Sequence, residues 1–189
     1  MIAGLGNVGS EYTGTRHNVG FEVVDLLAGR LGVDVKKRKF GGLFGETVFS
    51  DGKLILLKPG KYMNRSGEVI ATAVGFYKIG LSNIIVVSDE MALEPGRIRI
   101  RSQGSAGGHN GLSDVISKLG SSDFARLRVG IGSAGGAAGT DYVLSRPAAT
   151  ERELIDKSIA NSVEALDCWL CDGIEEAMNR FNVRGNEVE

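Results

Sequence analysis

Residues 4–27 read GLGNVGSEYTGTRHNVGFEVVDLL, a glycine-rich turn followed by an apolar pattern of helical spacing. Apolar residues recur at i, i+4, i+7 and i+8 from Val19, which predicts a helix with one buried face that ends at Gly32. His17 then lies at or just before the first turn, where free backbone N–H groups and the helix dipole disfavour a charged imidazole. A neutral imidazole can act as a general base, although an isolated histidine more often caps a helix or fills a gap.

The composition favours one compact α/β domain over residues 1–189. The chain is 42% hydrophobic, which is enough for a single sizeable core. Its formal net charge is −1, so an anionic partner would have to be held by a local basic patch. No apolar run has the length of a membrane span, and the first residues lead into the glycine turn without a signal-peptide core. We therefore expect a cytoplasmic protein without membrane association. We also expect a monomer, because the chain offers no evident sticky edge or heptad pattern.

Short β-rich segments alternate with helical patterns along the chain. Residues 43–49 and 53–58 are predicted to form two strands joined at Asp51-Gly52, a strong hairpin signal. The β-branched run of residues 84–87 indicates a strand buried on both faces. Together these patterns predict a central mixed, mostly parallel, twisted sheet with helices on both faces.

Two further segments carry specific structural predictions. The basic run of residues 36–39 is interpreted as a surface loop. The last long helix is predicted to begin at a capping box of Thr150 and Glu153, to bury Leu154, and to be interrupted at Asp172-Gly173.

The glycine turn, Gly4–Gly9, matches the dinucleotide-binding pattern G-x-G-x-x-G. Its context does not match, because no helix opens at the third glycine and the acidic residue at the expected distance, Asp25, falls inside a helix. We therefore expect no cofactor, and NAD(P) binding is the alternative. Cys168 and Cys171 form a C-x-x-C within a helical pattern but have no second ligand pair, so no metal site is expected.

The polar candidates for a site fall at the ends of loops and strands. Asp89 follows the buried strand, where open α/β sheets place ligand-facing groups, so it is a candidate to orient His17. No serine or cysteine has a nucleophile-elbow context, and what remains is one histidine, one aspartate and several amide side chains. This set suits attack of water on an activated acyl group such as an ester. The other candidates are Asn7, Tyr12, Asn64, which has helix capping as its alternative role, His109 and Asn110.

Alternating arginines suggest a surface for anions. Residues 97–101 read RIRIR, so a strand would place three arginines on one face. Guanidinium groups side by side repel one another unless anions neutralise them, which suits a row of phosphates; a solvated sheet face is the alternative. Arg128 lies on another predicted strand with its own alternating basic residues.

Several motifs together resemble the bacterial peptidyl-tRNA hydrolase family, in order and with the expected spacing. They are GLGNVGSEYTGTRHNVGFEVVDLLA, KPGKYMNRSGEVI, SDE, RIRIRSQGSAGGHNGLSDVISKLG and FARLRVGIG, which span most of the chain. The resemblance implies cleavage of the ester between a nascent or N-blocked peptide and the terminal ribose of tRNA, without a metal. A non-catalytic RNA-binding homologue of the same fold is the alternative.

The resemblance also implies roles for single residues. His17 is the base that activates water, Asp89 holds its basic form, and Asn7 distinguishes N-blocked from free aminoacyl ends. The residues implied to position or bind the substrate and its tRNA are Tyr12, Tyr62, Met63, Asn64, His109, Asn110, Arg99, Arg101 and Arg128.

The chain departs from the family pattern at three places. Val8 stands where the family usually has proline, and the N-terminus is a few residues shorter than usual. Residues 133–140 contain only Ser, Ala, Gly and Thr and lack the charged residues often found there. With residues 141–144 this segment is predicted to form a lid over the site.

Overall fold

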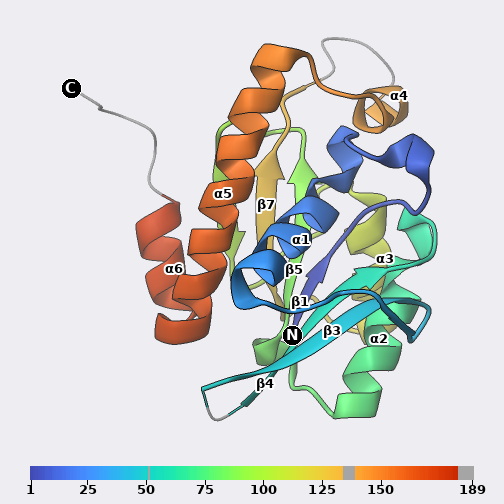
Figure 1. Cartoon of the computed structure of the whole chain (residues 1–189), viewed down its shortest axis with the longest axis vertical. Helices are drawn as coiled ribbons and strands as arrows, with labels where there is room; N and C mark the ends of the chain where they lie inside the picture. The colour runs from blue at the N-terminus through green and yellow to red at the C-terminus, as the bar shows by residue number, and fades with distance from the viewer. Residues whose placement is uncertain (51, 134–138, 183–189) are drawn as a thin grey trace.

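The computed structural model describes residues 1–50, 52–133 and 139–182 (Figure 1). The strands are β1 (Ile2–Gly4), β2 (Lys37–Lys39), β3 (Gly42–Phe49), β4 (Gly52–Pro59), β5 (Ile85–Glu90), β6 (Ile98–Arg101) and β7 (Ala125–Gly130). The α-helices are α1 (Val19–Leu31), α2 (Ser66–Tyr77), α3 (Asn110–Leu119), α4 (Gly139–Leu144), α5 (Ala149–Asp172) and α6 (Ile174–Phe181). Short 3-10 turns are η1 (Ser10–Tyr12), η2 (Arg16–Asn18), η3 (Met63–Arg65) and η4 (Leu81–Asn83).

The seven strands form one mixed sheet in the order β2-β3-β4-β1-β5-β7-β6. The four inner strands from β4 to β7 run parallel, whereas β2, β3 and β6 are antiparallel to their neighbours. The predicted mixed sheet is therefore confirmed, with its parallel part at the centre. The carboxyl ends of β1 and β5 lie side by side in the parallel part, where such sheets hold ligands.

Helices cover both faces of the sheet, as predicted. On one face α1, α5 and α6 pack with the sheet into a core that includes Val23, Leu127 and Ile159, and Figure 1 shows α1 and α5 on the near side of the sheet. On the other face α2 and α3 enclose a second core that includes Ile70 and Leu112. Within the described ranges, every helix is too short or too polar to cross a bilayer.

The glycines of the N-terminal turn allow α1 to lie directly on the backbone of the neighbouring strands. A Cβ atom on Gly20, in the first turn of α1, would lie 2.5 Å from the carbonyl oxygen of Leu5 and 2.6 Å from that of Val87. A Cβ atom on Gly6 would lie 2.7 Å from the ring of Phe21. Gly6 and Gly20 therefore allow close packing between helix and sheet.

Three local predictions were wrong. Residues 37–39 form β2, an exposed edge strand paired with β3, because backbone pairing at a sheet edge tolerates solvated lysine and arginine. No capping box forms: α5 begins at Ala149 after Ala148, which makes no side-chain cap. Leu154 is 42% exposed, since the helical phase turns Ile155 and Ile159 inward instead.

Two other local predictions are confirmed. The β3–β4 hairpin is confirmed by pairing from Gly42–Pro59 to Phe49–Gly52, although Asp51 lies outside the described residues. The break at Gly173 between α5 and α6 is also confirmed. Of the predicted lid, residues 134–138 lie outside the described part, and the segment after them forms α4.

Candidate active site

His17 is held by Asp89 beneath the amino end of α1. It lies in η2 immediately before the helix, and its Nδ1 is 2.8 Å from Oδ1 of Asp89 at the carboxyl end of β5. Both side chains are buried, so the contact is shielded from water. An acceptor at Nδ1 places the ring proton there and leaves the lone pair on Nε2, which makes no hydrogen bond within the described residues.

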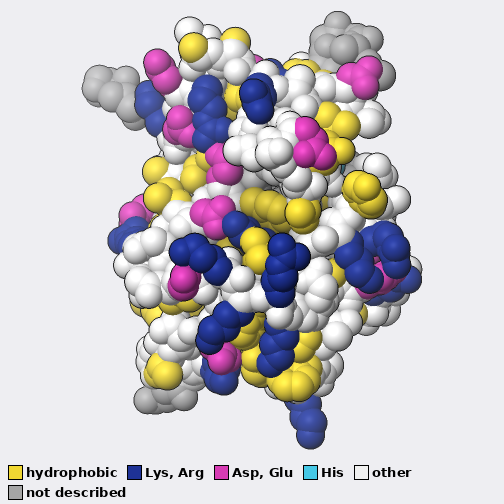
Figure 2. Space-filling view, turned by 45° about the vertical axis from the view of Figure 1, so that its right-hand side comes forward, with side chains coloured by type: hydrophobic (Ala, Val, Ile, Leu, Met, Phe, Trp, Pro, Cys, Tyr) yellow, Lys and Arg dark blue, Asp and Glu magenta, His cyan; other side chains and the backbone are white. Residues whose placement is uncertain are grey.

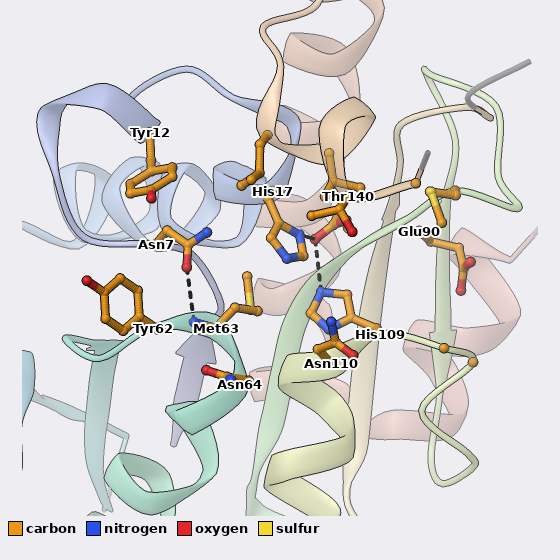
Figure 3. Close-up of a pocket in the computed structure, with 17 residues that line it drawn as sticks. Asn7, Tyr12, His17, Tyr62, Met63, Asn64, Glu90, His109, Asn110 and Thr140 are labelled. Carbon is orange, nitrogen blue, oxygen red and sulfur yellow. Dashed lines mark hydrogen bonds and ion pairs between the residues drawn. The ribbon is translucent and has the colours of Figure 1, made fainter. Parts of the chain in front are cut away.

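His109 is the second partner of Asp89, a contact that the sequence did not reveal. Its Nδ1 accepts hydrogen bonds from the backbone N–H groups of Gly111 and Leu112, at 3.1 and 3.2 Å, and so caps α3. An Nδ1 that accepts two N–H groups carries no proton, so the ring proton is on Nε2, which donates to Oδ1 of Asp89 at 2.9 Å. Figure 3 shows His17 and His109 meeting at the same carboxylate. His109 also lines the pocket, and its contact with the substrate stays a prediction.

The two histidines decide the charge of Asp89. Burial raises the pKa of this carboxyl, but the interactions with His109 and His17 outweigh burial and hold the pKa well below its usual range. Asp89 is therefore an anion throughout the pH range in which enzymes work. A carboxylate at Nδ1 fixes the tautomer of His17 and stabilises the imidazolium that forms when Nε2 takes a proton.

The same three residues are the group that could hold a metal ion. Their ligand atoms lie within 4.8 Å of one another, which sequence spacing did not indicate. The nitrogen–oxygen distances of 2.8 and 2.9 Å are those of hydrogen bonds, and a metal would have to displace both ring protons. Hydrogen bonding alone therefore explains why the ligand atoms of these three residues lie close together.

Asn7 is fixed beside His17 by bonds to two neighbouring segments. Its backbone N–H donates to Oδ1 of Asn18 at 2.8 Å, and Nδ2 of Asn18 donates to the carbonyl oxygen of Asn7 at 3.0 Å. The side-chain oxygen of Asn7 accepts from the backbone N–H of Met63 at 3.0 Å, which leaves its NH2 group facing the pocket (Figure 3). Asn18 was missed by the sequence interpretation, although it precedes the helix directly.

One pocket of about 490 Å³ brings the predicted residues together. Nine of the twelve predicted site residues line it: Asn7, Tyr12, His17, Tyr62, Met63, Asn64, Asp89, His109 and Asn110. Asn64 is exposed and does not cap α2, whose first turn has no side-chain cap. Gly107, Gly108 and the side of α4 with Thr140 and Val143 complete the wall, and α4 lies in the segment that was predicted to cover the site; Met91, which also lines the pocket, was not singled out from the sequence.

The predicted arginines lie outside this pocket. Arg99 is paired across the ladder with Arg128, and both belong to the β6–β7 edge of the sheet. Arg99 and Arg101 are exposed, whereas Arg128 forms an ion pair with Glu90 at 2.5 Å. Arg126 is buried, and burial together with the nearby charge of Arg128 lowers its pKa to about 10. Arg99 and Arg101 are therefore the two of this set that are open to solvent.

Comparison with known proteins identifies the family of this chain. A family model described as Peptidyl-tRNA hydrolase matches residues 1–189. A peptidyl-tRNA hydrolase of Caldanaerobacter subterraneus subsp. tengcongensis is 50% identical over 182 residues, which cover 96% of this chain and 98% of that protein. One of Clostridium botulinum is 47% identical, with 96% of each chain covered.

Solved structures give the same result. The crystal structure of peptidyl-tRNA hydrolase from Acinetobacter baumannii superposes with a TM-score of 0.91 at 38% identity, covering 96% of this chain and 93% of that one. A peptidyl-tRNA hydrolase in complex with N-propanol gives a TM-score of 0.92 at 36% identity, covering 98% and 95%. By sequence over its whole length and by fold, this chain belongs to the peptidyl-tRNA hydrolase family.

Proposed function

We propose that this chain hydrolyses peptidyl-tRNA by attack of a water molecule that His17 activates as general base. The activity follows from the family to which the chain belongs, and the assignment of roles to residues rests on the geometry of the pocket. The observation that carries it is the 2.8 Å contact of His17 Nδ1 with the buried carboxylate of Asp89, which directs the unprotonated Nε2 to the pocket.

The proposed reaction needs no other proton carrier. Nε2 of His17 takes a proton from water as its oxygen attacks the carbonyl carbon of the ester, and a tetrahedral oxyanion forms. When the intermediate collapses, the ribose oxygen leaves and takes the proton from Nε2, so that the peptide acid and the free tRNA hydroxyl are the products. Asp89 stabilises the imidazolium between the two steps without changing its own protonation.

The amide side chains are proposed to bind the substrate around this centre. Asn7 presents an NH2 group to the pocket, a donor suited to a carbonyl oxygen of the N-blocked peptide. Asn64 and Asn110 line the same pocket on the side of η3 and α3. We propose that they orient the acyl group and the attacking water, and that exposed Tyr62 contacts the end of the substrate.

The tRNA body is proposed to be held by local basic surfaces, since the net charge of the chain is −1. Figure 2 shows that Lys and Arg side chains gather in groups on one face, with apolar side chains between them. Arg99 and Arg101 on β6 are exposed at the sheet edge and are proposed to contact phosphates. A monomer in the cytoplasm remains our expectation for the active form.

The test is release of the acyl group from N-acetyl-aminoacyl-tRNA and from unblocked aminoacyl-tRNA, with EDTA present. Cleavage of the blocked substrate alone is the expected result, and it would support the discrimination assigned to Asn7 and a reaction without a metal. Binding of tRNA without cleavage would instead favour a non-catalytic RNA-binding homologue. No observation in the structure favours that alternative, because His17 and Asp89 are in contact.

A further inference from the structure

Arg16 is buried next to His17 in a network that the proposed chemistry does not use. Its side chain is 7% exposed, and its guanidinium donates to both carboxylate oxygens of Glu151 in the first turn of α5, at 2.9 and 2.5 Å. A two-bond contact of this kind is strong and fixes the relative orientation of the two groups. The turn that carries His17 is thereby fastened to the amino end of α5.

The remaining contacts of Arg16 are to α4 and the residue that follows it. Nη1 donates to Oγ of Ser145 at 2.6 Å, and the guanidinium lies 4.1 Å from the ring centre of Tyr142. The backbone N–H of Arg16 donates to the carbonyl oxygen of Ser145 at 3.1 Å. The hydroxyl of Tyr142 in turn lies 2.6 Å from the carbonyl oxygen of Ile131 and 3.1 Å from Glu151. Arg16 is thus the point at which α4, α5 and the His17 turn meet.

α4 is a wall of the catalytic pocket. It has only six residues, too few for a helix that is stable by itself. Thr140, Val143 and Leu144 nevertheless line the same pocket as Asn7 and Met63. The position of this wall therefore depends on contacts with neighbouring elements, and the Arg16 network supplies the polar part of them.

We propose that Arg16 is a positioning residue that, with Glu151 and Ser145, holds α4 as the wall of the pocket. It touches neither the water nor the ester. Its effect passes through Thr140 and Val143, which would contact the acyl part of the substrate equally in the ground state and the transition state. Loss of Arg16 therefore reduces the fraction of molecules with a completed pocket, which raises KM and leaves kcat nearly unchanged. This inference rests on the proposed function of the pocket.

The experiment compares Arg16→Lys with wild type on N-acetyl-aminoacyl-tRNA. Lysine keeps the charge but cannot donate to Glu151 in the forked geometry and to Ser145 at once. KM is expected to rise about tenfold while kcat and the pH profile of kcat stay as in wild type. Hydrogen exchange of the amides of residues 139–145, measured by mass spectrometry, is expected to become faster. Ser145→Ala, an exposed position that does not threaten folding, should raise KM about threefold.

Arg152→Lys is the matched control. Arg152 is on the same helix as Glu151 and forms a similar pair with Glu22 at 2.5 Å, but it lies outside the catalytic pocket. This variant is expected to keep the wild-type KM. An equal rise in KM for Arg152→Lys, or a fall in kcat with unchanged KM for Arg16→Lys, would overturn the proposal. The exchange measurement needs no activity, so a wild-type protein that fails to cleave the ester would refute the function while the contact of Arg16 with α4 is still tested.

Discussion

Replacing Asp89 by Asn tests whether the charge at Nδ1 of His17, and not only the hydrogen bond, accelerates hydrolysis. Asparagine has nearly the same shape as aspartate. Its carbonyl oxygen can still accept hydrogen bonds from both histidines, which donate to Asp89 at 2.8 and 2.9 Å in the wild-type structure. The variant therefore removes the negative charge and leaves most of the geometry intact. What is lost is the attraction between the carboxylate and the imidazolium that forms during the reaction.

The size of the loss follows from the distance between the charges. With the charge of the imidazolium spread over its ring, the separation is about 4 Å, and two unit charges at that distance attract by about 4 kcal/mol at an effective dielectric constant of 20. Each 1.36 kcal/mol changes a rate tenfold, so kcat is expected to fall by about 10³. The affinity for tRNA should be unchanged, since Asp89 is buried and bonded to His17 and His109.

Single-turnover release of N-acetyl-amino acid from labelled N-acetyl-aminoacyl-tRNA measures the chemical step directly. Asp114→Asn is the control, because Asp114 also accepts a hydrogen bond within the fold, from Gly67 at 2.7 Å, and lies outside the pocket. A fall of less than about fivefold for Asp89→Asn, in a protein that melts like wild type, would refute the role of the charge.

Four further results are expected. Gly20→Ala should destabilise the fold by about 2 kcal/mol or more in urea titrations, because its Cβ would meet backbone atoms. The Cβ of Gly29→Ala, in the same helix, would meet no atom within 4 Å, so this variant should stabilise the fold by up to about 1 kcal/mol. His109→Ala should lower both kcat and stability, the latter by about 1 kcal/mol in the same titration, through loss of the α3 cap. Replacing Arg99 and Arg101 by Gln should weaken tRNA binding and reduce by about 2 the slope of log binding constant against log salt concentration. An unchanged slope would favour the alternative, that these arginines form only a solvated sheet face. Because its pKa is depressed in the folded state, Asp89 contributes stability at pH values above about 3.9, and this stability is lost as the pH falls further. The melting temperature of Asp89→Asn should therefore fall less steeply at acid pH than that of wild type.

The sheet could be predicted from the sequence because its signals are local. The β-branched run became β5, with Ile85, Val86 and Val87 fully buried, and the alternation of residues 97–101 became β6 with Ile100 buried and Arg99 exposed. The start of α5 could not be predicted in the same way. Glu151 there is fixed by Arg16, which is 135 residues away, and no local pattern shows such a contact.

In the candidate site, too, one contact could be predicted from the sequence and another could not. The contact between His17 and Asp89 was expected, because one begins a helix and the other ends a central strand, and parallel strands end at the same edge. The bond from His109 to Asp89 was not expected. It depends on the path of the glycine-rich loop before α3, where Gly107 and Gly108 have φ values of 60° and 84° that no periodic pattern encodes.

The place of β1 in the sheet has a consequence for how the chain is made. β1 precedes the other described strands along the chain, yet it is central, with β4 and β5 as neighbours. A growing chain therefore carries its middle strand without partners until much later residues have emerged, and non-local pairings of this kind form slowly. His17 is likewise made long before Asp89, 72 residues further on. A nascent chain that stops before Asp89, after somewhat less than half of the 189 residues, therefore has His17, the proposed base, without its carboxylate.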